Sequence, residues 1–185
     1  MLQLIESLEI PDVKLVKQPV HGDDRGFFTE CYSQRTFATQ GIEAKFVQDN
    51  HSLSREKGVV RGLHFQSPPH AQGKLVRAIR GAIFDVAVDI RKGSDTFGQH
   101  VSRTLTSENH EQLWVPPGFA HGFCTLEPDT EVIYKVTDYY APECDLGIQW
   151  NDPKLAIAWP ITNDAAILSA KDQKQPGLAD IDSPF

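Results

Sequence analysis

The sequence predicts an all-β fold, a sandwich or barrel of the class that contains the jelly rolls. Many short segments rich in Val, Ile, Phe, Tyr and Thr are separated by clusters of Gly, Pro, Asn and Asp, which is the pattern of strands and turns. Helical periodicity is weak along the whole chain. A chain of 185 residues without an internal repeat or a linker is expected to form a single domain, residues 1–185.

Strands are expected at residues 26–32, 45–51, 58–66, 74–80, 82–90, 97–105, 112–115, 119–126 and 131–139. The alternation is clearest in AIFDVAVDI, which places Phe84, Val86, Val88 and Ile90 on one face and Ile83, Asp85, Ala87 and Asp89 on the other. The segment 33–39 is the one expected helix, with Ser33 as its N-cap. The tail 159–185, which holds three prolines, is expected to be irregular.

The composition limits the kinds of partner. A net charge of −7 argues against non-specific binding to nucleic acid, which needs a basic face. The chain has no run of about 18 apolar residues, so we expect no membrane span. Its acidic N-terminus does not have the basic flank and apolar core of a signal peptide, and a cytoplasmic location is expected. Cys31, Cys124 and Cys144 form no CxxC pair, which argues against a disulfide framework or a thiolate zinc site.

Two segments, GVVRGLHFQSPPHAQGKLVRAIRG and WVPPGFAHGF, resemble the two half-motifs of a cupin barrel. In metal-binding cupins these motifs supply His-x-His, a glutamate and a further histidine to a divalent cation. Here Gln66 stands two positions after His64, the first segment has no glutamate, and Lys74 brings a positive charge. Because His64 and His121 beside a cation are a poor ligand set for a divalent metal, we expect the barrel without a metal or another cofactor.

The remaining side chains suit proton transfer next to a ketone. This chemistry needs a base, an acid on the opposite face and a positive group near the developing enolate charge. His64 is a suitable base because imidazole titrates near neutral pH, and a carboxylate behind it, either Asp172 or Asp85, would set its tautomer. Lys74 is expected to stabilise the enolate oxygen, and Tyr134 to return a proton from the other face. Taken singly, each of these side chains is as readily explained by a structural role.

Two arginines and two amides are candidate substrate ligands. Arg25 and Arg61 each stand beside a glycine, and their guanidinium groups suit bidentate recognition of phosphate. Gln48 and Asn50 fall on one face of a strand, where they can read the polar edges of a base or a sugar.

Arg61 and His64 have opposite parity and would face opposite sides of a regular strand. For both to line one cavity, the strand needs a bulge or a bend. We expect this irregularity at Gly62, because glycine within a strand often marks such a place.

Nine segments together resemble the dTDP-4-dehydrorhamnose 3,5-epimerase family. They run in order from about residue 22 to residue 173: GDDRGFFTE, FVQDNHS, VVRGLHFQ, QGKLVRAIRG, FDVAVDIRKGSDTFG, QLWVPPGFAHGF, YKVTDYYAPE, IQWNDP and SAKD. The resemblance implies a jelly-roll cupin homodimer in which N-terminal strands, within about residues 1–20, are exchanged between subunits. It also implies cofactor-free epimerisation at C3 and C5 of a small nucleotide-sugar substrate, dTDP-4-dehydro-6-deoxy-D-glucose.

The resemblance also assigns roles to individual residues. The implied catalytic residues are His64 as base, Asp172 as its partner, Tyr134 as acid and Lys74 at the enolate. The implied substrate-binding residues are Arg25, Glu30, Gln48, Asp49, Asn50, Arg61, His121, Tyr140, Asp145 and Lys171. The Tyr140 ring is expected to stack on thymine. In YYAPECD both Glu143 and Asp145 are available as the binding carboxylate, and Asp145 is preferred.

Other functions stay open at this point. A 3-epimerase or 5-epimerase of the same fold, acting on a related sugar, would share nearly every motif. A 3,4-ketoisomerase would also use histidine bases, although the positions of Lys74 and Tyr134 count against it. A sugar-nucleotide-binding module without catalysis would lose little when His64 is replaced, whereas an epimerase would lose most of its turnover.

Overall fold

The computed structural model describes residues 4–185 and consists mainly of β-strands. The strands are β1 (Leu4–Ser7), β2 (Lys14–Lys17), β3 (His21–Asp23), β4 (Gly26–Phe28), β5 (Gln48–Ser54), β6 (Val60–Gln66), β7 (Lys74–Arg80), β8 (Ala82–Asp89), β9 (His100–Thr106), β10 (Glu111–Val115), β11 (Phe119–Thr125), β12 (Thr130–Val136) and β13 (Asp145–Gly147). The helical segments are α1 (Gln34–Thr39), η1 (Pro142–Cys144), η2 (Asp172–Lys174) and η3 (Leu178–Asp180).

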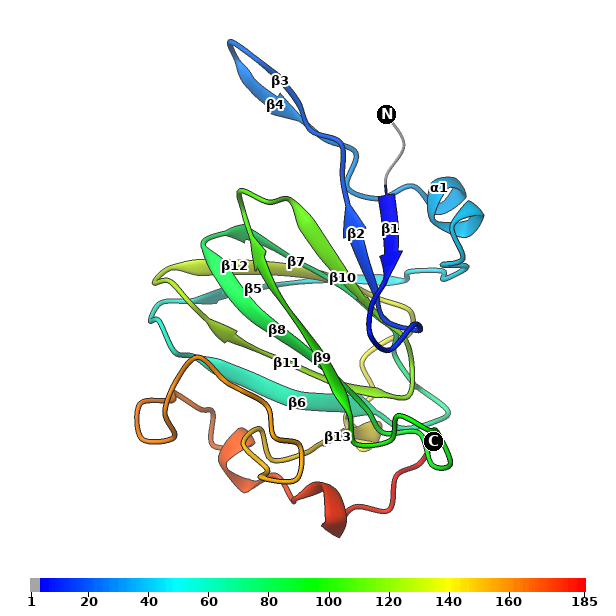
Figure 1. Cartoon of the computed structure of the whole chain (residues 1–185), viewed down its shortest axis with the longest axis vertical. Helices are drawn as coiled ribbons and strands as arrows, with labels where there is room; N and C mark the ends of the chain where they lie inside the picture. Colours follow the sequence, from blue (N-terminus) through cyan, green and yellow to red (C-terminus); the bar gives the residue numbers. More distant parts are fainter. Residues whose placement is uncertain (1–3) are drawn as a thin grey trace.

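Two antiparallel sheets face each other, so the predicted all-β jelly-roll class is confirmed (Figure 1). One sheet has six strands in the order β1-β2-β10-β7-β12-β5, and the other has five in the order β13-β6-β11-β8-β9. The hairpin β3–β4 belongs to neither sheet and projects away from both (Figure 1). Within this chain β2 pairs with β10; the exchange of N-terminal strands between subunits stays a prediction.

Each of the nine expected strands corresponds to a strand of the structure, and α1 is the expected helix. The Ser33 side chain accepts a hydrogen bond from the Thr36 amide, as predicted for an N-cap. The expected strand 97–105 begins later, at His100, because Phe97 and Gln99 close turns onto the carbonyl groups of Ser94 and Thr96. Strands β1, β2, β3 and β13 were not resolved as separate strands by the sequence pattern.

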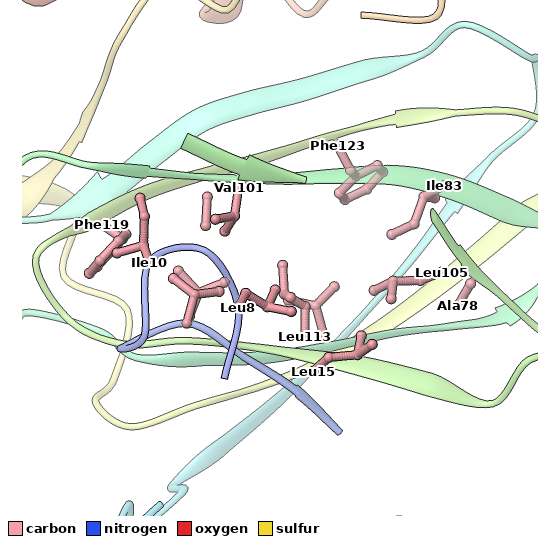
Figure 2. Packing of buried hydrophobic residues seen from close by; sticks show 14 of the residues in the cluster. Leu8, Ile10, Leu15, Ala78, Ile83, Val101, Leu105, Leu113, Phe119 and Phe123 are labelled. Carbon is pink, nitrogen blue, oxygen red and sulfur yellow. The ribbon is translucent and has the colours of Figure 1, made fainter. Parts of the chain in front are cut away.

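A hydrophobic core lies between the two sheets (Figure 2). It combines inward-facing residues of β7 to β12 with Leu8, Ile10 and Leu15 from the N-terminal segment. Burial of each large side chain contributes about 1.5–3 kcal/mol to stability, so this cluster holds the two sheets in a fixed relation. Another part of this space, next to β5 and β6, is lined by polar side chains such as Arg61, His64 and Lys74 together with apolar ones.

The C-terminal tail covers the outer face of the five-stranded sheet. Val86 and Val88 of β8, together with Ile90 just after it, pack there against Leu155 and the tail residue Leu178. The other face of β8 points between the sheets, where Ile83 and Ala87 join the inner core, which confirms the predicted alternation. The tail contains η2 and η3 and forms one isolated bridge, between Val59 and Ile167. None of the described helices has the length and apolar character of a membrane span.

A bulge in β6 places Arg61 and His64 on the same side of their sheet. His121 of β11 pairs with His64 of β6, and Phe123 of β11 pairs with Arg61 of β6. The two residues on β11 are two positions apart, whereas their partners on β6 are three positions apart, so β6 contains one extra residue. The bulge lies at Gly62, whose φ is +128°, and so confirms the predicted irregularity. A Cβ atom on Gly62 would lie 2.6 Å from the Cα of Gly122 and 2.8 Å from the His121 carbonyl oxygen. Only glycine allows the two backbones to approach this closely.

We expect Gly62→Ala to lower the free energy of unfolding by about 2–4 kcal/mol, because strain at positive φ adds to overpacking against β11. Gly93→Ala is the matched control, since Gly93 also has a positive φ, +77°, but has open space around it. Chemical denaturation of both variants measures the difference. Equal losses of stability would contradict the importance of the contact between β6 and β11.

Candidate active site

A pocket of about 430 Å³ opens between the two sheets. Its walls come from β5, β7 and β12 of one sheet, β6 and β11 of the other, and the C-terminal tail. A second pocket of about 240 Å³ adjoins it. The two pockets share His64, Lys74 and Tyr134, so three of the four predicted catalytic residues lie where the pockets meet.

His64 is paired with Asp172. The Nε2 atom of His64 lies 2.5 Å from Oδ1 of Asp172, and the Asp172 side chain is 3% exposed against 30% for His64. Ser169 of the same tail segment donates its hydroxyl to the other oxygen of Asp172 at 2.8 Å. Burial raises the pKa of Asp172, but hydrogen bonds from His64 and Ser169 outweigh it and hold the pKa below its usual range. Of the two carboxylates considered for His64, the structure therefore selects Asp172.

The other carboxylate, Asp85, is paired with His121. The Nε2 atom of His121 lies 2.7 Å from Oδ1 of Asp85, and both side chains are buried. His121 and His64 are directly opposite each other on β11 and β6. Two histidine–aspartate pairs therefore stand side by side on the wall formed by the five-stranded sheet.

Lys74 enters the pocket from the six-stranded sheet. Its Nζ donates a hydrogen bond to the carbonyl oxygen of His64 at 3.2 Å, which fixes the ammonium group beside the imidazole. Desolvation lowers the pKa of Lys74 to about 8, against the opposing effect of the negative charges of Asp145 and Asp85. The Lys74 ammonium group therefore loses its proton more readily than that of an exposed lysine, at a pH where the enzyme can be assayed.

Tyr134 faces His64 from the other sheet. It lies on β12, where it pairs with Asn50 of β5 and Val76 of β7, and its ring packs against the inner core. Burial raises the pKa of its hydroxyl above the ordinary value, although the positive charge of Arg61 opposes this. The phenol therefore remains protonated at neutral pH. An imidazole and a phenol on opposite walls of one pocket can exchange protons with two faces of a bound ring.

The smaller pocket gathers five of the predicted substrate-binding residues, which are Gln48, Asn50, Tyr140, Asp145 and Lys171. Asp145 accepts hydrogen bonds from the Tyr140 hydroxyl at 3.0 Å and from Lys171 Nζ at 2.5 Å. Tyr140 is 58% exposed, as a stacking platform requires. Glu143 is exposed and lines neither pocket, so the geometry favours Asp145 as the carboxylate of this site.

Arg61 lies in the larger pocket, where its guanidinium group donates to the Ser54 hydroxyl and to the Leu53 carbonyl oxygen, both at 3.2 Å. The structure does not bring Arg25, Glu30 or Asp49 to either pocket. Arg25 lies on the projecting hairpin with its side chain 89% exposed and paired with Asp23. Asp49 faces the outer side of β5, opposite in parity to Gln48 and Asn50, and pairs there with Lys135.

Several pocket residues were not identified from the sequence: Ser52, Gln66, Gln72, Phe123 and Ser169. Strand parity could have found Ser52, because it continues the inward series of Gln48 and Asn50 along β5. The Ser-x-x-Asp spacing of SAKD could have indicated Ser169 as a hydrogen-bond partner of Asp172. Within residues 4–185, no group of three or more His, Cys, Asp or Glu side chains is arranged to hold a metal ion.

Comparison with known proteins agrees with this geometry. A family model described as dTDP-4-dehydrorhamnose 3,5-epimerase matches residues 7–180. A Pseudomonas aeruginosa protein of that name is 55% identical over 176 residues, which cover 95% of this chain and 96% of the relative.

Two solved structures superpose closely. The dTDP-4-dehydrorhamnose 3,5-epimerase of Bacillus anthracis, with TDP and PPi bound, is 51% identical with a TM-score of 0.91, over 95% of this chain and 99% of that chain. The dTDP-6-deoxy-D-glucose-3,5-epimerase of Legionella pneumophila, in complex with dTDP-4-keto-L-rhamnose, is 48% identical with a TM-score of 0.92, over 97% and 95% of the two chains. The pocket geometry, the family match and these two superpositions agree: the chain belongs to the dTDP-4-dehydrorhamnose 3,5-epimerase family of isomerases.

Proposed function

We propose that the chain epimerises dTDP-4-dehydro-6-deoxy-D-glucose at C3 and C5 and so forms dTDP-4-dehydro-L-rhamnose. The observation that carries this proposal is the position of His64 and Tyr134 on opposite walls of one pocket. A carbon next to a ketone is inverted when a base removes its proton from one face and an acid returns a proton to the other. The dTDP-4-keto-L-rhamnose bound to the Legionella relative supports the choice of substrate.

The proposed reaction proceeds through an enolate. His64 Nδ1 accepts the proton from C5 or C3, because Nε2 donates to the Asp172 carboxylate, and the electron pair of the broken C–H bond forms the enolate with its charge on the C4 oxygen. Asp172, 2.5 Å from the ring, stabilises the imidazolium that forms. Lys74 neutralises the charge on the C4 oxygen. Tyr134 then donates its phenolic proton to the opposite face of the same carbon as the C4 carbonyl re-forms. His64 releases its proton to solvent and Tyr134 regains one from solvent before the sequence repeats at the second carbon.

The two joined pockets suit the two parts of a nucleotide sugar. The sugar ring occupies the junction, within reach of the three catalytic side chains, and the nucleoside extends along the smaller pocket to stack on Tyr140. Gln48 and Asn50, joined by a 2.8 Å hydrogen bond, offer polar atoms along this route. Lys171, which lines the smaller pocket, supplies positive charge for the diphosphate along this route, and Arg61 supplies positive charge in the larger pocket.

The proposed function predicts deuterium incorporation at two carbons. When dTDP-4-dehydro-6-deoxyglucose is incubated with the protein in deuterium oxide, the C3 and C5 proton signals should both disappear from the NMR spectrum, with or without a chelator. Exchange at C3 alone or C5 alone would assign the chain to the single-site epimerases. No exchange would exclude an epimerase for this substrate and favour a binding module.

The charge of Lys74 predicts that kcat/KM decreases at alkaline pH, which gives the pH profile an alkaline limb. Since the protonated form stabilises the enolate and its pKa is about 8, kcat/KM should fall as the pH rises through this value. Tyr134 does not cause the fall, because its pKa is raised above the ordinary value for tyrosine. Lys74→Arg is the control variant, since a guanidinium group keeps its charge and should remove this limb. A flat wild-type profile up to about pH 10 would contradict the role of Lys74.

A homodimer is part of the proposal. The β3–β4 hairpin projects from the body of the chain (Figure 1). It carries Arg25, and its Phe27 and Phe28 are 61% and 71% exposed. Adjacent exposed aromatic side chains form an apolar patch, and such patches mark protein–protein interfaces more often than isolated exposed residues do. We infer that the hairpin of one subunit reaches the pocket of the other, so that Arg25 and Glu30 act there. This accounts for two predicted binding residues that lie away from their own pocket.

Mixed dimers test this arrangement. The Arg25→Ala and His64→Asn variants are unfolded, mixed and refolded together. If the hairpin of one subunit reaches the pocket of the other, about a quarter of the wild-type activity should return, because half of the dimers are mixed and each mixed dimer has one intact site. The pair Tyr134→Phe and His64→Asn is the control, since both defects lie in the same pocket walls and every site in the mixed dimer remains defective. Restoration no greater than in this control would contradict the crossing.

We also propose a cytoplasmic location. Cys31, Cys124 and Cys144 are all free thiols, which suits a reducing compartment.

A further inference from the structure

Asp85 is a buried carboxylate that the proposed mechanism leaves without a role. It lies on β8 with 0% of its surface exposed, and its Oδ1 binds His121 Nε2. Its second oxygen, Oδ2, is buried and has no hydrogen-bond partner among residues 4–185. A buried carboxylate oxygen without a partner lowers stability. A group that is retained at such a cost needs an explanation beyond packing.

Asp89 on the same face of β8 shows what a purely structural carboxylate looks like in this fold. It is equally buried, and its two oxygens receive hydrogen bonds from Arg91, Ser94 and Thr96. It therefore ties the strand to the following loop and is fully satisfied. Asp85, in contrast, has a single partner, and that partner lines the larger pocket.

His121 is a lining residue of the larger pocket. The imidazole is joined through Nε2 to Asp85, and Nδ1 has no hydrogen-bond partner within the described part of the chain. Because a carboxylate accepts and does not donate, the proton of this hydrogen bond belongs to Nε2. Nδ1 is consequently the atom available to a ligand. It lies beside His64, its direct cross-strand neighbour, and in the same pocket as Lys74.

We propose that Asp85 is a positioning residue of the active site, which fixes the orientation and tautomer of His121 so that Nδ1 binds an oxygen of the sugar during enolate formation. This inference rests on the proposed function and deepens it, since it adds a second group beside Lys74 at the reacting end of the substrate. His64 and His121 then have different tasks: one moves protons and the other holds the oxygen substituents still. Each task has its own buried aspartate.

Asp85 also acts on Lys74 through its charge. Several charged or titratable groups surround Lys74: Asp85 from β8, Asp145 from β13, Lys171 from the tail, His64 and Arg61 from β6, His121 from β11 and Tyr134 from β12. Asp85 and Asp145 are the two negative charges that favour the ammonium form. Loss of the Asp85 charge removes part of this support, so Lys74 should lose its proton at a lower pH.

The test compares Asp85→Asn with Asp89→Asn. An asparagine at position 85 keeps the shape of the side chain but can donate to Nε2, which permits the wrong tautomer of His121. We expect kcat to fall on the order of 100-fold in Asp85→Asn with little change in KM. The alkaline fall of kcat/KM in this variant should occur at a lower pH than in the wild type. Asp89→Asn should lose stability but keep the wild-type limb. If both variants have the same kcat and the same alkaline limb, the inference is wrong.

A second measurement is made on the wild-type protein and does not depend on the stability of the Asp85 and Asp89 variants. The ¹⁵N chemical shifts of the His121 imidazole in the wild-type protein, assigned by comparison with His121→Asn, should show Nε2 protonated. An unprotonated Nε2 would overturn the inference. These outcomes are distinct from failure of the proposed function, in which the wild-type protein itself would not exchange the C3 and C5 protons of the substrate.

Discussion

The close approach of the β6 and β11 backbones at Gly62 and Gly122 is the contact on which the geometry of the site depends. A Cβ atom on either glycine would lie within 3 Å of the backbone of the facing strand. The bulge that this approach permits reverses the parity of β6, so that Arg61 and His64 both point between the sheets. Without it, a regular strand would direct one of the two into the outer layer, where the tail packs.

The second requirement is the tail itself. Its apolar side chains pack on the outer face of the five-stranded sheet, and its bridge to Val59 leads directly into the segment that holds Ser169 and Asp172. The carboxylate thus reaches His64 from 108 residues away in the sequence. The pair of His121 and Asp85 is built differently, because both residues come from neighbouring strands of one sheet, β11 and β8. One histidine is therefore supported from the tail and the other from within the sheet.

The parts of the fold that could be predicted are those whose cause is local. Alternation of apolar residues marks β8 unambiguously, and Ser33 marks the start of α1. The bulge at Gly62 followed from requiring Arg61 and His64 to share a cavity. Short strands such as β1 and β13 have too few residues to show a period, and their existence depends on the strands beside them.

A site residue could be predicted where the family resemblance or the strand parity gave its position. It was harder to predict where contacts between distant segments decide which side chains meet. The residues alone left the choice between Asp172 and Asp85 as the partner of His64 open, and the resemblance assigned Asp172. The structure pairs His64 with Asp172 and gives Asp85 its own histidine. Parity alone would have separated Asp49 from Gln48 and Asn50, and the structure indeed turns Asp49 outward. Arg25 and Glu30 lie outside the pocket of their own chain, which no pattern within one sequence could indicate.

The central claim is that a base and an acid act from opposite sheets on one carbon. The most direct measurement is the reaction of Tyr134→Phe in deuterium oxide, followed by NMR for both deuterium content and configuration. Because His64 can remove a proton and return a deuteron to the same face, this account predicts that exchange persists at C3 and C5 while inversion falls on the order of 100-fold or more. Inversion at the wild-type rate would contradict it, since the proton would then have to arrive from a group other than Tyr134.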